Sequence, residues 1–153
     1  MKKVKRSPMK SVLALAGKSG VGKSRTIKRV YDLLLEKYHN AIEVHKQKNL
    51  RVEVQVIIDI NGKRVGIESR GDHESYVKKA LNIFADAKCK VILCATKSDG
   101  NTLKAVDAFG IERGYAVTRI YKFGEPIESK QKQSNEKCAM EIMEKIEHLL
   151  LTA

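Results

Sequence analysis

The segment 17–24, Gly-Lys-Ser-Gly-Val-Gly-Lys-Ser, carries the residue types best suited to chemistry in this 153-residue chain. Two of its glycines, Gly17 and Gly22, permit backbone conformations that a Cβ would obstruct, so that successive amides can turn toward an anion such as phosphate. The amine of Lys23 could reach two phosphates of a nucleotide, and the hydroxyl of Ser24 could bind a Mg²⁺ ion that bridges them. The segment therefore predicts a phosphate-binding loop.

The residues on either side of this loop predict the elements that hold it. Residues 11–16 (S-V-L-A-L-A) form a nearly continuous apolar run, which is typical of a buried parallel strand. Residues 26–38 repeat apolar side chains at helical spacing, with Ile27, Val30 and Leu34 on one face. A helix that starts directly after the loop would add the positive end of its dipole to the anion site. We therefore expect a strand, the loop and a helix in succession.

The pattern G-x-x-x-x-G-K-[ST] in this setting resembles the Walker A motif of the P-loop NTPase superfamily. The resemblance covers about the first quarter of the chain and leaves the reaction open. It implies Mg²⁺ and a nucleoside triphosphate as cofactors, with ATP favoured over GTP. The residues that it implicates in nucleotide binding are Gly17, Lys18, Ser19, Gly20, Val21, Gly22, Lys23, Ser24 and Arg25.

Hydrolysis or transfer of a phosphoryl group also needs an acid near the metal, usually at the carboxyl end of a strand beside the first one. Residues 65–72 leave a predicted strand and enter a predicted helix, and they contain suitable side chains. We expect Asp72 to hold Mg²⁺ through water together with Ser24, and Glu68 or His73 to orient an attacking water. Arg70 could stabilise the developing charge. Asp72 could also act as the N-cap of the following helix.

A second polar segment, 96–102 (T-K-S-D-G-N-T), follows another apolar run. Its first four residues resemble the guanine-recognition motif of GTPases, but too few elements separate it from the proposed metal region. An alternative places Lys97 near the γ-phosphate, with Asn101 or Thr102 as a polar sensor of the nucleotide. A third alternative makes Asp99 or Asn101 the N-cap of the next helix.

Residues 51–60 alternate between apolar and polar side chains, as in a half-buried strand. Asn61 and Gly62 then predict a tight hairpin turn into a returning strand over 63–69. This early layout partly resembles that of Ras-like GTPases, although the D-x-x-G signature of those proteins is missing at the end of the returning strand. Residues 38–49 are weakly patterned and are expected to form a connection.

Hydrophobic periodicity further predicts helices over 73–87, 102–109 and 135–151, strands over 90–95 and 116–123, and a polar loop over 124–134. The expected fold is α/β, a three-layer P-loop NTPase sandwich with about five mostly parallel strands and an antiparallel hairpin edge strand. Residues 11–153 would form a single nucleotide-binding domain after a basic tail over 1–10.

The net charge of +12 is concentrated in the first third, since residues 1–50 contribute +10 and the rest +2. This basic third could bind an acidic protein or nucleic acid, or the tail could simply be a solvated terminus. No stretch is long enough to span a membrane, and the apolar run after the tail is too short for a signal peptide, so we expect a cytoplasmic protein. The three cysteines are expected to be structural.

These observations predict a small Mg²⁺-dependent ATP-binding protein, and a nucleoside triphosphatase that hydrolyses ATP slowly is the leading hypothesis. The catalytic candidates are Lys23, Asp72, Glu68 and Arg70. An alternative is a small-molecule or nucleotide kinase, in which Asp72 or Glu68 would be the base and Lys130 and Lys132 would belong to a lid. A third reading is a GTPase or a binding module that nucleotide orders.

Overall fold

The structure, a computed structural model, describes residues 9–47 and 53–151. Within them, one sheet of six strands has the order β2-β3-β4-β5-β1-β6. All neighbouring pairs among β4, β5, β1 and β6 are parallel, whereas β3 runs antiparallel to both β2 and β4. The strands are β1 (Ser11–Ala16), β2 (Ile42–Lys46), β3 (Gln55–Ile60), β4 (Lys63–Glu68), β5 (Val91–Thr96) and β6 (Ala116–Tyr121).

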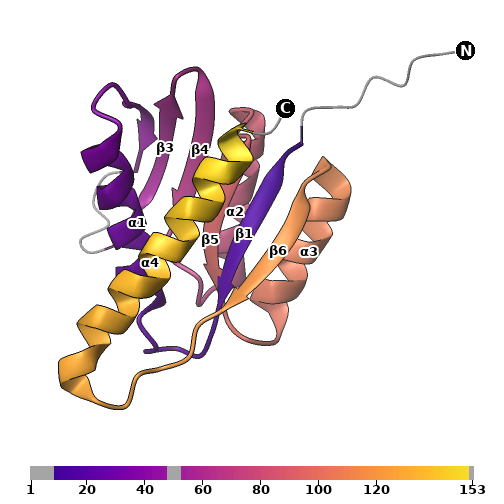
Figure 1. The fold of residues 1–153 in the computed structure, drawn as a ribbon. Helices are drawn as coiled ribbons and strands as arrows, with labels where there is room; N and C mark the ends of the chain where they lie inside the picture. Colours follow the sequence, from indigo (N-terminus) through magenta and orange to yellow (C-terminus); the bar gives the residue numbers. More distant parts are fainter. Residues whose placement is uncertain (1–8, 48–52, 152–153) are drawn as a thin grey trace, which may run out of the picture.

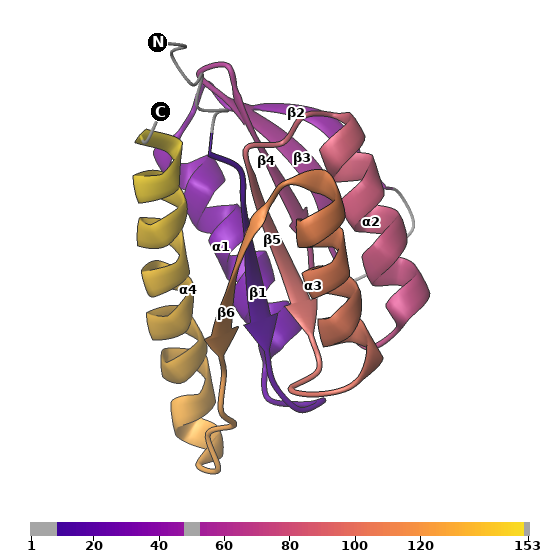
Figure 2. The same cartoon turned by 90° about the vertical axis from the view of Figure 1, so that its right-hand side faces the viewer.

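Helices cover both faces of the sheet and complete three layers. The helices in the described residues are α1 (Lys23–Lys37), α2 (Glu74–Asp86), α3 (Asn101–Arg113) and α4 (Glu128–Leu151). Figure 1 shows α1 and α4 lying in front of the sheet, and the rotated view in Figure 2 places α2 and α3 on the opposite face. The expected α/β class and mostly parallel sheet are therefore confirmed.

The central strand β1 shows why its sequence is continuously apolar. All six of its residues are buried. Leu13 and Leu15 join the core cluster under α1 and α4, whereas Val12 and Ala14 join the cluster under α2 and α3. A strand covered on both faces buries both sets of alternating side chains.

The predicted connection over 38–49 instead contains the edge strand β2, so the sheet has six strands in the described residues and the hairpin does not form the edge. The side chains of β2 are mostly exposed, and its pairing with β3 shifts register between Glu43 and His45. An exposed strand with an irregular register has no buried apolar face. The period-2 pattern that identifies strands is therefore weak here.

The hairpin itself is confirmed, with Ile60 paired to Lys63 across the turn. Asn61 and Gly62 have φ values of 53° and 86°, as a tight turn of this type requires. The expectation of a half-buried strand was wrong. Gln55, on the predicted polar face, is only 2% exposed, because helices cover both faces. Residues 51 and 52 of the predicted strand lie outside the described residues.

Two helices are longer than predicted. Helix α3 does not end at Gly110, because Gly114, with a φ of 74°, is its C-cap. Gly110 is needed for packing instead, since a Cβ there would lie 2.6 Å from a methyl carbon of Val117. Helix α4 begins at Glu128, so most of the predicted loop over 124–134 is helical. Its first turns are polar, and its buried residues begin only at Ala139.

The basic tail was predicted over 1–10, and residues 1–8 lie outside the described residues. Lys10 belongs to the folded domain, because its Nζ donates to the Arg113 carbonyl at 3.2 Å and lies 4.8 Å from the centre of the Tyr115 ring. No helix in the described part of the chain is long and apolar enough to cross a bilayer. Cys89 and Cys94 are buried, as predicted, and burial raises the pKa of both thiols to about 12.

Candidate functional site

The glycine-rich 17–24 loop joins β1 to α1 and depends on its glycines for two different reasons. Gly20 and Gly22 have φ values of 85° and 93°, which side chains other than glycine rarely adopt. Gly17 allows a close approach instead, since a Cβ there would lie 2.7 Å from the carbonyl oxygen of Lys122. A Cβ on Gly22 would also lie 2.6 Å from an oxygen of Asn135 in α4. The loop therefore needs glycine for close packing at Gly17 and Gly22 and for its backbone conformation at Gly20 and Gly22.

The loop opens into a cleft of about 580 Å³. Among the described residues, the backbone amides of Gly20, Gly22 and Lys23 have no intramolecular acceptor. Helix α1 begins here with no acidic residue in its first turn. Free amides and the positive end of a helix dipole favour an anion at this point.

Seven of the nine residues implicated by the Walker A resemblance line this cleft. They are Ser19, Gly20, Val21, Gly22, Lys23, Ser24 and Arg25. Gly17 and Lys18 are not among the lining residues. Gly17 is buried beneath the loop, and Lys18 is exposed.

Lys23 is buried at the base of the loop, with 6% of its surface exposed. Its Nζ donates to the carbonyl oxygens of Gly17 at 2.7 Å and Thr96 at 2.6 Å. Burial lowers the pKa of Lys23, while the charge of Asp72 opposes that shift and the charge of Lys97 adds to it. The ammonium group is thus poorly hydrated, and a phosphate nearby would stabilise its charge.

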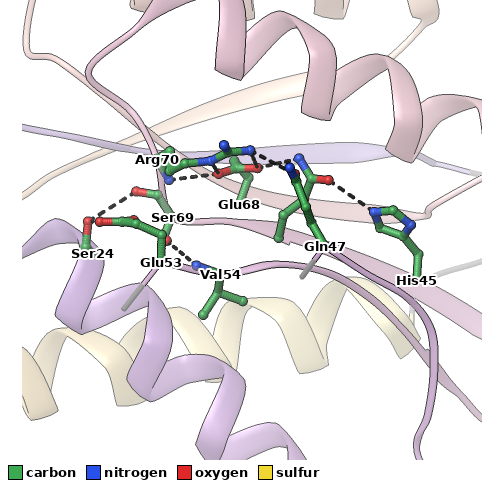
Figure 3. Close-up of polar contacts among 9 residues, drawn as sticks. Ser24, His45, Gln47, Glu53, Val54, Glu68, Ser69 and Arg70 are labelled. Atoms are coloured by element: carbon green, nitrogen blue, oxygen red, sulfur yellow. Dashed lines mark hydrogen bonds and ion pairs between the residues drawn. The ribbon is translucent and has the colours of Figure 1, made fainter. Parts of the chain in front are cut away.

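The hydroxyl of Ser24 lies against a carboxylate that the sequence analysis did not single out. Its Oγ is 3.3 Å from Glu53 Oε2 and donates to the Ser69 carbonyl at 3.3 Å. The Ser69 hydroxyl donates to the same Glu53 oxygen at 2.5 Å and accepts from the Val54 amide at 2.7 Å (Figure 3). Glu53 is therefore held at the cleft, which it also lines.

The hairpin contained a signal that could have identified Glu53. Because β3 is antiparallel to β4, the residues before β3 lie at the same sheet edge as the residues after β4. Gln55 pairs with Glu68, so Glu53 lies beside the segment that follows β4. The alternating pattern alone had assigned Glu53 to the polar face of a strand.

Asp72 reaches the loop from a strand that is not adjacent to β1, contrary to expectation. Strand β5 lies between β1 and β4, and the chain crosses over the end of β5. A Cβ on Gly71 would lie 2.5 Å from the carbonyl group of Ala95, so glycine allows this crossing. The Asp72 carboxylate accepts a hydrogen bond from Ser19 Oγ at 3.2 Å. The N-cap of α2 is His73, without a side-chain cap bond, so Asp72 does not cap that helix.

Glu68 is buried behind the cleft and forms an ion pair with Arg70, which is partly exposed. Glu68 is fully buried, and its oxygens accept from Arg70 Nε at 2.9 Å and Gln55 Nε2 at 2.8 Å. Arg70 lines the cleft, with its guanidinium carbon 4.6 Å from the centre of the Tyr76 ring. Glu68 is not among the lining residues, so the pair places Arg70 rather than Glu68 at the cleft. His73 also lines it.

The 96–102 segment is held by a hydrogen bond between two of its own residues. The amide of Lys97 donates to the hydroxyl of Thr102 at 3.0 Å, and neither residue lines the cleft. The N-cap of α3 is Gly100, with no side-chain cap bond, so the prediction that Asp99 or Asn101 caps this helix was wrong.

The far wall of the cleft comes from the segment after β6 and from the start of α4, most of which was predicted to be a loop over 124–134. Gly124, Glu125, Gln131 and Asn135 line it there. Lys130 and Lys132, the expected lid residues, lie in the first turns of α4 and not in a loop.

No protein-family model and no curated protein sequence matches the chain. A solved structure described as "Crystal structure of APE1195" aligns with a TM-score of 0.40 and 16% identity, over 91% of this chain and 77% of that chain. A similarity of this size carries no inference about activity.

Proposed function

We propose that this protein is a small P-loop nucleoside triphosphatase that binds Mg-ATP and hydrolyses it slowly. The observation that supports the proposal most is the position of Lys23. Its buried ammonium lies within hydrogen-bonding distance of two carbonyls at the base of a loop, and residues of this loop with unpaired amides line a cleft. A triphosphate in the cleft would accept from those amides and give Lys23 an anionic partner.

The donor atoms at the cleft suit Mg²⁺, which prefers oxygen ligands and is commonly held by one or two carboxylates together with substrate phosphates. The hydroxyl of Ser24 and the carboxylate of either Glu53 or Asp72 could provide such oxygens. When bound, Mg²⁺ would neutralise charge that develops on the phosphates during the reaction.

Asp72 and Arg70 have roles in the chemical step of this proposal. Asp72 is exposed at the rim of the loop, where its carboxylate could accept a proton from an attacking water. Arg70 is held at the wall by Glu68, so that its guanidinium could stabilise negative charge on the transferred group. In this account Glu68 is a positioning residue that acts through Arg70.

ATP is preferred to GTP in the proposal because the segment that resembles a guanine-recognition motif supplies none of the residues that line the cleft. Neither Lys97 nor Asp99 is among the lining residues. A cytoplasmic location, where Mg²⁺ and ATP are both available, accords with this function.

The experiment that tests the proposal measures phosphate release from ATP and from GTP, with Mg²⁺ and without any acceptor. The account expects slow release from ATP, its loss in Lys23→Ala, and no change in Lys28→Ala, because Lys28 is exposed on α1. Transfer to an added hydroxyl compound without release in water would indicate a kinase instead. No release and no transfer would contradict both reactions.

A further inference from the structure

We propose that Glu53 is the carboxylate that coordinates the divalent metal together with Ser24, so that Asp72 is left free for a different task. This inference rests on the proposed function, because the metal would enter with a nucleoside triphosphate. It replaces the expectation from the sequence, in which Asp72 holds the metal together with Ser24.

The distance between the two oxygen atoms supports this assignment. Ser24 Oγ and Glu53 Oε2 are 3.3 Å apart. Adjacent ligands on an octahedron with metal–oxygen bonds of about 2.1 Å are about 3 Å apart. The two oxygens are therefore already close to the separation that a shared Mg²⁺ ion requires, and only a small shift would bring them to it.

A hydrogen bond from Ser69 holds the Glu53 carboxylate in this orientation, and a second hydrogen bond holds Ser69. The hydroxyl of Ser69 donates to Oε2 at 2.5 Å, and the amide of Val54 fixes that hydroxyl at 2.7 Å. Ser69 also accepts from Ser24 through its carbonyl, so one residue contacts both prospective ligands (Figure 3). Ser69 is a positioning residue, of the kind that usually orients metal ligands.

The charge of Glu53 is not balanced by an ion pair within the described residues. The negative charge of Glu53 helps to raise the pKa of Arg70, but Arg70 is already paired with Glu68. Glu53 is also partly buried, so its carboxylate is less well solvated than a surface acid. A divalent cation beside Ser24 would place positive charge next to this carboxylate.

Asp72 contacts a different residue of the loop. Its carboxylate accepts a hydrogen bond from Ser19 and is exposed, and its charge opposes the lowering of the Lys23 pKa. The two carboxylates thus contact different loop residues, Glu53 at Ser24 and Asp72 at Ser19. This division leaves Asp72 free to act on water.

The test measures ATP binding by calorimetry over a series of Mg²⁺ concentrations and in EDTA, which does not require turnover. For Glu53→Gln, the Mg²⁺ concentration needed for half of the metal-dependent gain in affinity should rise by about tenfold or more. Its affinity for ATP in EDTA should stay equal or improve, because a negative charge near the triphosphate is removed. Asp72→Asn should leave the Mg²⁺ requirement within about twofold of wild type.

Glu53→Asp provides a second variant that keeps the charge but shortens its reach, and it should also raise the Mg²⁺ requirement. If Glu53→Gln does not fold, the Mg²⁺ requirement of Glu53→Asp tests the assignment instead. A normal Mg²⁺ requirement in the folded Glu53 variants, or a raised one in Asp72→Asn alone, would overturn the assignment while leaving nucleotide binding intact. A wild-type protein that binds no ATP at all would instead overturn the proposed function and this inference with it.

Discussion

Ser19 donates a hydrogen bond to the Asp72 carboxylate at 3.2 Å, although the two residues are 53 positions apart and belong to segments that follow non-adjacent strands. The contact exists because residues 69–72 cross the end of β5 in close contact with its backbone. It places an acid at the rim of the 17–24 loop. The arrangement of the cleft therefore depends on a crossing that only a residue without a side chain can make.

Gly71→Ala should disrupt this crossing, because the new Cβ would lie 2.5 Å from the carbonyl of Ala95. Forcing an atom into a packed position costs about 1–3 kcal/mol of unfolding free energy. Denaturant unfolding measures the loss, and phosphate release from ATP should fall as Asp72 is displaced. Gly124→Ala is the matched control, since its nearest contact would be an ordinary 3.4 Å. Equal stability of the two variants would refute the crossing as described.

Glu68→Ala should destabilise the protein by about 1–3 kcal/mol, because it leaves Gln55 and the partly buried Arg70 guanidinium without their acceptor. Glu74→Ala removes an exposed pair with Lys78 and should cost no more than about 0.5 kcal/mol. Denaturant midpoints compare the two variants directly. A Glu68 variant as stable as wild type, but inactive, would indicate instead that this carboxylate takes part in the chemistry.

The contact between α1 and α4 should respond to acid. Arg29 donates to both oxygens of Glu136, at 2.6 and 3.1 Å, and this hydrogen bonding lowers the pKa of Glu136. A lowered pKa contributes stability above the ordinary carboxyl pKa of about 4.3, and the contribution is lost as pH falls through the lowered value. Thermal melts should therefore show Glu136→Gln below wild type at pH 7, with the gap closing in acid.

Glu141→Gln is the control for that measurement, because Glu141 is exposed on α4. Its melting temperature should follow that of wild type across the same pH range. A gap for Glu136→Gln that stays constant into acid would argue against the ion pair as its cause.

Much of the fold could be predicted because most strands are covered on both faces or end in clear turns. The run in β1 and the turn at Asn61 and Gly62 are local signals that the tertiary structure does not override. Strand β2 and the first turns of α4 could not be predicted from periodicity, since neither buries an apolar face. Hydrophobic patterning reports only the elements that contribute to the core.

The candidate site was predicted in part. The 17–24 loop is continuous in sequence and was identified directly. The position of Glu53 depends on the register of the hairpin, and that of Asp72 depends on the crossing at Gly71. Both are relationships between distant segments. The separation of Glu68 from the cleft likewise follows from which face of β4 it occupies, where it pairs with Arg70 and Gln55.

The most direct test of the account is calorimetric titration of the wild-type protein, Lys23→Ala and Lys28→Ala with Mg-ATP. The account predicts that wild type and Lys28→Ala bind alike. Lys23→Ala should bind about 10- to 100-fold more weakly or not at all, because a hydrogen bond to a charged group contributes about 1.5–3 kcal/mol. Unchanged binding of both ATP and GTP by a folded Lys23→Ala variant would contradict the central claim.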